Sequence, residues 1–263
     1  MKINLSEDDL NAIDIYEQWN GIRNSEANSI YEELYPSIFM THVHEINYQL
    51  LTTTLSQFES VDVIQKYLTG EKINKDQFIL ITGLFINYIA SAIALRDSTR
   101  NMQKNDKLFP TALKKQAESK LQNEITSASS IKLVEDIRNI ITHQSLIVPA
   151  LSFIANDEGF FSGYAYKTKD LLNNKRLTEK SREYLLKINH GYLFLRPLID
   201  IYHHTTASYQ HWLINVALKK HKNDHPIYWQ ARENVSFEWG GDLEPSLPLP
   251  PSVNRPVLVP GIF

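Results

Sequence analysis

The sequence predicts an all-α fold: a helical bundle that carries one small β-hairpin and ends in an extended, proline-rich tail. Three observations support this prediction. Apolar residues recur at helical spacing through most of the chain, one short stretch instead has strand-like segments around a turn, and six of the 11 prolines lie between Pro245 and Pro260. We therefore expect residues 1–222 to form a helical domain, with the hairpin at about residues 151–166, and residues 223–263 to form the tail.

Consecutive helices account for the N-terminal half of the prediction. The first begins where Ser6 and Asp9 have the spacing of a capping box. Pro36 is expected to end a short second helix, because proline disfavours helical backbone in the residue before it, and Gly70 is expected to end a later helix. The predicted helices of this half cover residues 5–19, 30–34, 37–58, 61–68, 75–102, 110–124 and 130–146.

One of these helices must be distinguished from a membrane span. Its residues 78–95 form a run of 18 residues without a charge, which is near the lower limit for crossing a bilayer. Polar residues such as Asn87 interrupt the run, and Arg96 follows it directly. A helix that is buried on all sides within a bundle has a similar composition. We expect this buried arrangement and no membrane partner.

The C-terminal half combines the hairpin, further helices and the tail. Apolar and aromatic segments flank a turn at residues 157–159, which predicts the hairpin. Helical spacing returns at residues 178–188 and 192–220. From Glu244 onward the closely spaced prolines exclude helix and central strand, so we expect an extended segment that lies over its own or a partner's surface. Tyr228, Trp229 and Trp239 have side chains that can stack on nucleic-acid bases, but we expect them to anchor this tail, which is the more common role.

Composition excludes several functional classes. With 43% hydrophobic and 22% charged residues, the 263-residue chain is typical of a soluble globular protein, and its net charge of −3 argues against a protein that coats nucleic acid with a broad basic surface. The absence of cysteine excludes disulfides, thiolate metal sites and cysteine nucleophiles. No glycine-rich phosphate loop and no secretory signal are found, so a cytoplasmic protein without a nucleotide cofactor is expected.

The histidines do not predict a metal site. His42 and His44 are two residues apart and point to different sides of a helix. His204 and His211 are seven residues apart and share a face, where a ligand pair is conceivable. Packing or an interface is the more common role for such histidines, and no carboxylate has matching spacing. We therefore expect no metal and no cofactor.

The predicted helix at 130–146 carries the functional signal, in Arg138-Asn139, three further residues and His143. Asn139 and His143 are four residues apart and stack on the side of the helix that holds Glu135, and the long side chain of Arg138 reaches that side from its edge. Considered alone, this face is typical of a solvated helix end, where the helix dipole favours His143. The opposite, buried side is predicted to consist of Leu133, Val134, Ile137, Ile140 and Ile141.

The pattern Arg138-Asn139-x3-His143, late in a helical chain, resembles the Arg-x4–6-His motif of the HEPN superfamily. The long apolar helix before it, which contains Asn87 and ends in Arg96, Asp97 and Arg100, is similar to the corresponding helix of bacterial members. The resemblance covers about residues 37–220 and is one of pattern outside the motif. It implies a HEPN-type bundle, a homodimer with both motifs at one cleft, and a metal-independent endoribonuclease.

The resemblance also implies a role for each motif residue. RNA carries its own nucleophile, the 2′-OH, so cleavage needs an acid, a base and positive charge beside the phosphorus. His143 would act as acid or base, Arg138 would hold the scissile phosphate, and Asn139 would orient His143 or bind the phosphate. Residues 100–120 carry six basic and two acidic residues, which would attract RNA if they lie near the motif, although a solvated surface has the same composition.

Two classes of function follow. The first is an RNA endonuclease, such as a toxin or an antiphage defence effector, restrained by an antitoxin or a regulatory protein. The alternative is a catalytically inactive HEPN-like binding or regulatory module, because a fold can persist after its chemistry is lost. A helical regulatory protein whose proline-rich tail docks on a partner is a further possibility.

Overall fold

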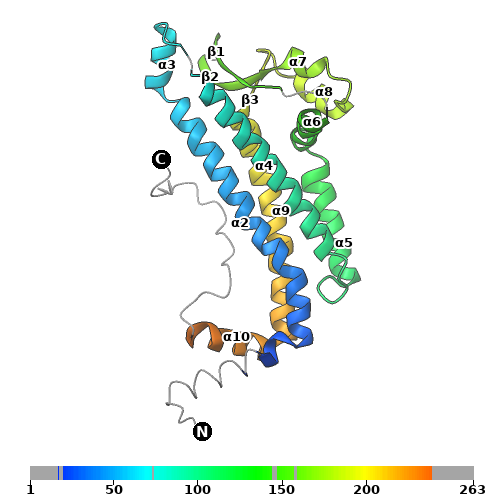
Figure 1. The fold of residues 1–263 in the computed structure, drawn as a ribbon. Helices are drawn as coiled ribbons and strands as arrows, with labels where there is room; N and C mark the ends of the chain where they lie inside the picture. Colours follow the sequence, from blue (N-terminus) through cyan, green and yellow to red (C-terminus); the bar gives the residue numbers. More distant parts are fainter. Residues whose placement is uncertain (1–16, 18–19, 73, 144–146, 157–158, 239–263) are drawn as a thin grey trace, which may run out of the picture.

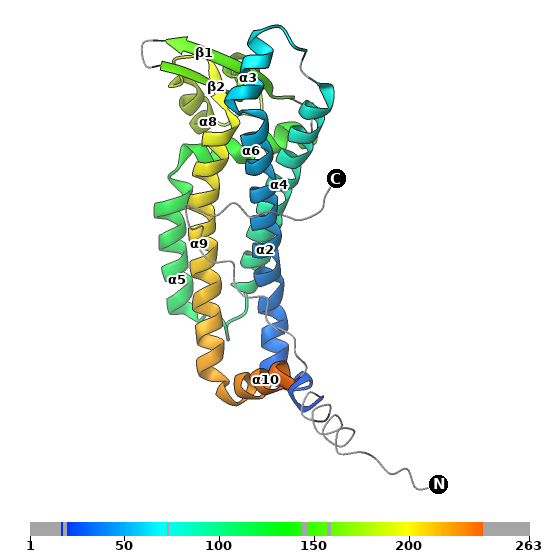
Figure 2. The same cartoon turned by 90° about the vertical axis from the view of Figure 1, so that its left-hand side faces the viewer.

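The computed structural model describes residues 17, 20–72, 74–143, 147–156 and 159–238 of the chain. It is mostly helical, with a small three-stranded antiparallel sheet, so the predicted helical class is confirmed. Figures 1 and 2 show three long helices side by side, the sheet with several short helices at one end, and α10 at the other.

The three long helices are α2 (Glu26–Phe58), α4 (Lys75–Met102) and α9 (Leu195–Asp224). Helices α2 and α4 are antiparallel, because Ser37 Oγ lies 3.0 Å from Ser98 Oγ and His44 Nδ1 lies 3.2 Å from Ser91 Oγ. Helix α9 joins them through further polar contacts and shared apolar side chains. These helices form the frame on which the candidate site is built.

Pro36 does not end a helix, contrary to the expectation from sequence. It lies inside α2, which joins the segments predicted separately at 30–34 and 37–58. Pro36 is exposed, and so is Glu32, whose carbonyl has lost its intrahelical partner. Solvent can satisfy that carbonyl, so the helix continues through the proline. The predicted helix at 5–19 lies outside the described residues except for residue 17, which is helical.

Helix α4 has the predicted bounds but is not buried on all sides. Asn74 caps its start by accepting a hydrogen bond from the Asp76 amide at 2.9 Å. In its most apolar 18-residue window only 44% of the residues are buried, and Ile79 is 70% exposed. By length and composition this one helix could also cross a membrane. The preceding α3 (Val61–Leu68) is followed by Gly70 at φ +99°, as expected for a glycine after a helix.

A π-helical turn separates the next two helices. Helix α5 (Thr111–Lys120) continues into η1 (Leu121–Thr126), and α6 (Ser129–His143) follows. The sequence predicted an ordinary helix over 110–124, because a change of hydrogen-bond register leaves no mark in apolar spacing. Such π-helical turns are rare and recur beside functional sites.

The predicted hairpin is confirmed and is part of a larger sheet. Strands β1 (Ala150–Asn156) and β2 (Gly159–Lys167) are antiparallel, with Asn156 opposite Gly159, and residues 157 and 158 of the predicted turn lie outside the described residues. A third strand, β3 (Tyr192–Phe194), pairs with β2, so the helix predicted from residue 192 begins at Leu195 instead. Two short helices lie between β2 and β3: α7 (Thr168–Leu172) and α8 (Glu179–Leu186).

The prediction of an extended tail from residue 223 is wrong for residues 226–238, which form α10 (Pro226–Glu238). Tyr228 and Trp229 are buried there against Tyr31, and Trp229 Nε1 donates to His221 Nδ1 at 2.9 Å. Burial of these aromatic side chains makes the helix favourable where spacing alone did not indicate one. The proline-rich residues 245–260 lie outside the described residues.

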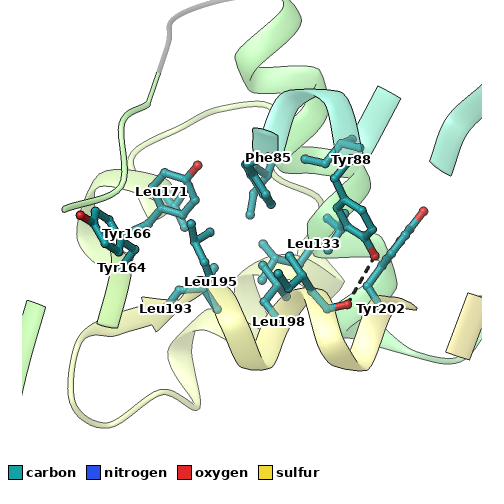
Figure 3. Packing of buried hydrophobic residues seen from close by; sticks show 14 of the residues in the cluster. Phe85, Tyr88, Leu133, Tyr164, Tyr166, Leu171, Leu193, Leu195, Leu198 and Tyr202 are labelled. Atoms are coloured by element: carbon teal, nitrogen blue, oxygen red, sulfur yellow. Dashed lines mark hydrogen bonds between the residues drawn. The ribbon is translucent and has the colours of Figure 1, made fainter. Parts of the chain in front are cut away.

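The apolar core has two parts. One lies at the sheet end, where Tyr164 and Tyr166 of β2 meet α4, α6 and α9 (Figure 3). There Tyr88 donates a hydrogen bond to the carbonyl of Ile199 at 3.4 Å. The other part lies towards α10 and includes Leu34, Phe109, Leu213 and Trp229. Helix α6 contributes its apolar side to the first part, which fixes the orientation of its other side.

Candidate functional site

The predicted buried side of α6 is confirmed. Leu133, Val134, Ile137 and Ile140 are at most 1% exposed, and Ile141 is partly buried against the same cluster. These side chains fix the rotation of α6 about its axis. Arg138 and Asn139 are only half-buried, as expected for residues at and beyond the edge of the apolar side.

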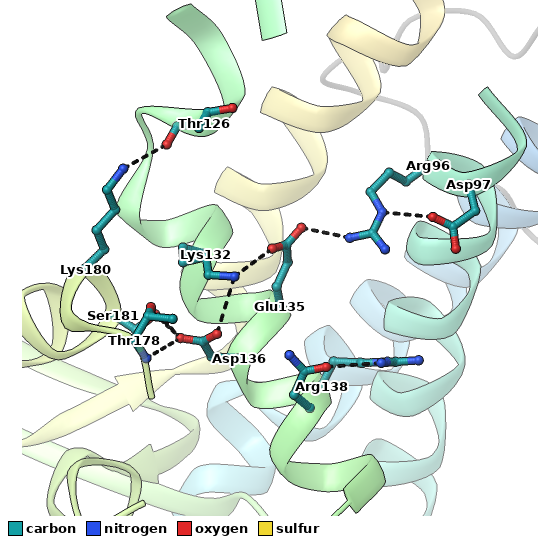
Figure 4. Close-up of polar contacts among 11 residues, drawn as sticks. Arg96, Asp97, Thr126, Lys132, Glu135, Asp136, Arg138, Thr178, Lys180 and Ser181 are labelled. Carbon is teal, nitrogen blue, oxygen red and sulfur yellow. Dashed lines mark hydrogen bonds and ion pairs between the residues drawn. The ribbon is translucent and has the colours of Figure 1, made fainter. Parts of the chain in front are cut away.

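The structure brings Arg138 and Asn139 together. Arg138 Nη1 donates a hydrogen bond to Asn139 Oδ1 at 3.1 Å, so the guanidinium and the amide hold each other in place (Figure 4). His143 is the last residue of α6, one turn after Asn139. The side chain of His143 lies outside what the structure describes. The geometry of the motif is therefore established for its first two residues.

Asp136 is a structural residue beside the motif that the sequence did not reveal. It is 2% exposed, and its Oδ2 accepts hydrogen bonds from the Thr178 amide at 2.8 Å, from Thr178 Oγ1 at 2.7 Å and from Ser181 Oγ at 2.7 Å. Its partners lie at the start of α8, where a negative charge also suits the helix dipole. Because they are 42 and 45 residues away in sequence, no local pattern could have predicted this carboxylate's role.

Glu135 links the motif helix to the end of α4 (Figure 4). Its carboxylate accepts from Arg96 Nη1 at 3.0 Å and from Lys132 Nζ at 3.2 Å. Arg96 Nε also donates to Asp97 Oδ1 at 3.2 Å, and Arg100 lies 3.8 Å from the same oxygen. Burial alone would lower the pKa of Arg96, but hydrogen bonds and charge from Asp97 and Glu135 raise it above its ordinary value. The helix end singled out by the resemblance thus does meet α6, through Glu135.

Several basic side chains of the segment 100–120 form ion pairs with acidic side chains. Lys107 pairs with Glu26, Lys114 Nζ lies 2.6 Å from Asp106 Oδ1, and Lys120 pairs with Glu124. Pairs of this kind at a surface reduce the charge available to a phosphate backbone. This segment is therefore a weaker argument for RNA binding than its composition indicated.

The central histidines are packed within the bundle. The His203 ring stacks on Tyr48 with centroids 3.6 Å apart, and its Nε2 lies 3.1 Å from Glu45 Oε2. Burial, together with nearby His203, lowers the pKa of His44 to about 3, so this ring is neutral. Among the described residues, no group of three or more His, Asp or Glu could hold a metal ion. His204 and His211 share an open depression whose described lining residues all belong to α9.

A cavity of about 600 Å³ lies beside the Glu135 network and is lined by residues of α2, α4, η1, α6, α8 and α9. Arg96 and Glu135 are among its lining residues, whereas Arg138 and Asn139 are not. The motif and the cavity therefore share one helix at different positions along it, with the cavity at residues 131–135 and the motif at residues 138–143.

Comparison of the chain with protein-family models, curated proteins and solved structures finds no match to any of them.

Proposed function

We propose that this chain is a HEPN-type, metal-independent endoribonuclease whose active site contains Arg138, Asn139 and His143. The observation that carries the proposal is the 3.1 Å hydrogen bond between Arg138 Nη1 and Asn139 Oδ1, on a part of α6 that its buried apolar side leaves accessible. A guanidinium held by an amide one helical turn before a histidine is a suitable arrangement for a phosphodiester.

The proposed reaction uses the nucleophile that RNA itself provides. A histidine removes the proton from the 2′-OH, the 2′-oxygen bonds to phosphorus, and the bond to the 5′-oxygen of the next nucleotide breaks. A second histidine protonates that leaving oxygen, so the products are a 2′,3′-cyclic phosphate and a free 5′-OH. Arg138 stabilises the charge that develops on the phosphoryl oxygens, and the Asn139 amide holds Arg138 and orients His143 or the phosphate.

Two histidines require two copies of the motif, so the proposed enzyme is a homodimer with an α6 end from each chain at one cleft. RNA and a second copy of the chain are its proposed partners. A cytoplasmic toxin or antiphage effector held in check by an antitoxin or regulatory protein is the proposed setting.

RNA cleavage with EDTA present tests this function. We expect the wild-type protein to cleave single-stranded RNA and to leave 2′,3′-cyclic phosphate ends, and His143→Ala to reduce the rate at least about 100-fold. Arg138→Gln should also lose activity. His204→Ala, a change of the same kind at an exposed position on α9, is the matched control and should keep wild-type activity. Equal cleavage by wild type and His143→Ala would refute the site.

The cavity favours a second candidate, a catalytically inactive HEPN-like binding or regulatory module. A cavity of about 600 Å³ lies within the usual range of small-molecule sites. This candidate predicts that no variant cleaves RNA, with or without a ligand in the cavity, while the wild-type protein still binds a small molecule there.

A further inference from the structure

The cavity beside α6 has the size and shape of a ligand site. Its volume of about 600 Å³ falls within the roughly 300–1,000 Å³ typical of small-molecule sites. Six separate elements line it, including α2 through His44, and η1 supplies Leu121 and Ile125 to its wall. A π-helical turn in the wall of a cavity is an unusual local conformation, and such turns recur at functional sites.

The inner surface of the cavity is mostly apolar, with the buried polar side chains of His44, Thr99 and Gln210 among its lining. Leu95, Ile131 and Ala92 line it and are 2%, 5% and 6% exposed. Tyr202 adds a flat ring, and burial raises the pKa of its hydroxyl well above the ordinary value, so the tyrosine is neutral. An occupant of this region would gain most from an apolar body.

The outer part of the cavity is charged. Among the described lining residues, Arg96, Arg100, Lys132 and Lys180 are basic, whereas Glu135 and Glu179 are acidic. These side chains are more exposed than the inner surface: Glu135 is 27%, Arg96 32% and Arg100 59% exposed. Lys180 donates to the neutral carbonyl of Thr126 at 3.3 Å. The lining itself has two more basic than acidic side chains, and Asp97 and Asp136 pair with Arg96 and Lys132 from just outside it. An anionic group would therefore bind here by taking the place of a carboxylate contact.

One buried polar group adjoins the cavity and lacks a partner. Gln210 lines it and is 7% exposed, and among the described residues its Oε1 has no hydrogen-bond partner. An unpaired buried amide oxygen is costly. A ligand that donates a hydrogen bond at this end of the cavity would remove that cost.

We propose that this cavity binds an amphipathic small molecule that places an apolar body against the aliphatic and aromatic side chains of the inner surface and one carboxylate or phosphate group beside Arg96, Arg100 and Lys132. A fatty acid and an alkyl or lipid phosphate share this chemistry. Glu135 already occupies Arg96 and Lys132, so the head group replaces part of that contact. The binding inference does not depend on RNA cleavage by the motif.

Binding of 1-anilinonaphthalene-8-sulfonate, an aromatic body with one anionic group, tests the proposal on the full chain. We expect saturable fluorescence enhancement with one site per chain. Arg100→Gln should weaken the affinity about fivefold, as expected for loss of one partly exposed charge contact. Lys104→Gln removes the same charge four residues away, just beyond the end of α4 and outside the lining, and should leave the affinity unchanged.

A second variant and four competitors complete the test. Ala128→Trp should fill the cavity and abolish binding, with a cooperative unfolding transition as evidence that the variant folds. Dodecanoate and dodecyl phosphate should displace the probe, and whichever does so at lower concentration identifies the head group; acetate and inorganic phosphate should not. Equal affinities of Arg100→Gln and Lys104→Gln, retained binding in folded Ala128→Trp, or displacement by inorganic phosphate alone would overturn the proposal.

Discussion

Replacing Asp136 with alanine tests whether this buried carboxylate holds α6 in place. The change removes the acceptor of three hydrogen bonds, which come from the Thr178 amide at 2.8 Å and from the Thr178 and Ser181 hydroxyls at 2.7 Å each. The two hydroxyls lie 3.1 Å apart and can bond to each other, so the main loss is the unpaired Thr178 amide. That loss costs about 1–3 kcal/mol, and loss of the charge at the start of α8 adds about 1 kcal/mol.

We therefore expect Asp136→Ala to lower the free energy of unfolding by about 3 kcal/mol, or the Tm by roughly 6–12 °C for a chain of this size. Thermal and urea unfolding followed by far-UV circular dichroism would measure the change. Asp136→Asn keeps one acceptor oxygen and should lose about half as much. Asp106→Ala is the control, because this carboxylate is 86% exposed and its ion pair with Lys114 should be worth less than about 1 kcal/mol. Asp136→Ala no less stable than Asp106→Ala would refute the reasoning.

Two further predictions concern pH and glycine. Burial and neighbouring His203 lower the pKa of His44 to about 3, below its ordinary value of 6.5, so the unfolded chain binds more protons as the pH falls below about 6.5. The free energy of unfolding should therefore decrease by up to about 1.4 kcal/mol per pH unit from this one group, and urea titrations at several pH values should show a shallower decrease for His44→Asn. Gly163→Ala should lower the Tm, because its Cβ would lie 2.8 Å from Glu59 Oε1, whereas Gly83→Ala in α4 meets nothing within 4 Å and should raise the free energy of unfolding by about 1 kcal/mol. Equal Tm changes for the two glycine variants would contradict the close approach at Gly163.

Local patterns predicted the elements that depend on local physics. The bounds of α4 and α3 follow from the Asn74 cap and from Gly70, each of which acts within a few residues of its helix end. The buried side of α6 follows from apolar spacing, because a helix of known period has only one face that can hold Leu133 and Ile137 together. The hairpin follows from a turn between two short apolar segments.

Features that depend on distant contacts were missed or mistaken. Strand β3 has three residues, too few for a period to be recognised, and it exists because β2 offers a partner. Helix α10 is stabilised by the contact of Trp229 with Tyr31, nearly 200 residues away. Helix α2 continues through Pro36 because Pro36 and Glu32 are exposed to solvent, and this exposure cannot be deduced from the local sequence.

The sequence predicted the residues of the candidate site but not the contacts that surround them. The helical spacing of Asn139 and His143 is a local property, whereas the contact of Glu135 with Arg96 joins positions 39 residues apart. No sequence pattern could have indicated the cavity, because residues of six separate elements enclose it.

The π-helical turn η1 has a consequence for how this protein can change in evolution. Each of its hydrogen bonds encloses one residue more than an α-helical bond, so residues Leu121–Thr126 behave as a helix that has gained an extra residue. A π-helical turn absorbs its extra residue locally, so deleting one residue would let the segment return to α-helix without rotating α5 about its axis. The wide turn would then be lost from the wall to which Leu121 and Ile125 contribute. The shape of the space enclosed there therefore depends on the length of this segment, which insertions and deletions alter.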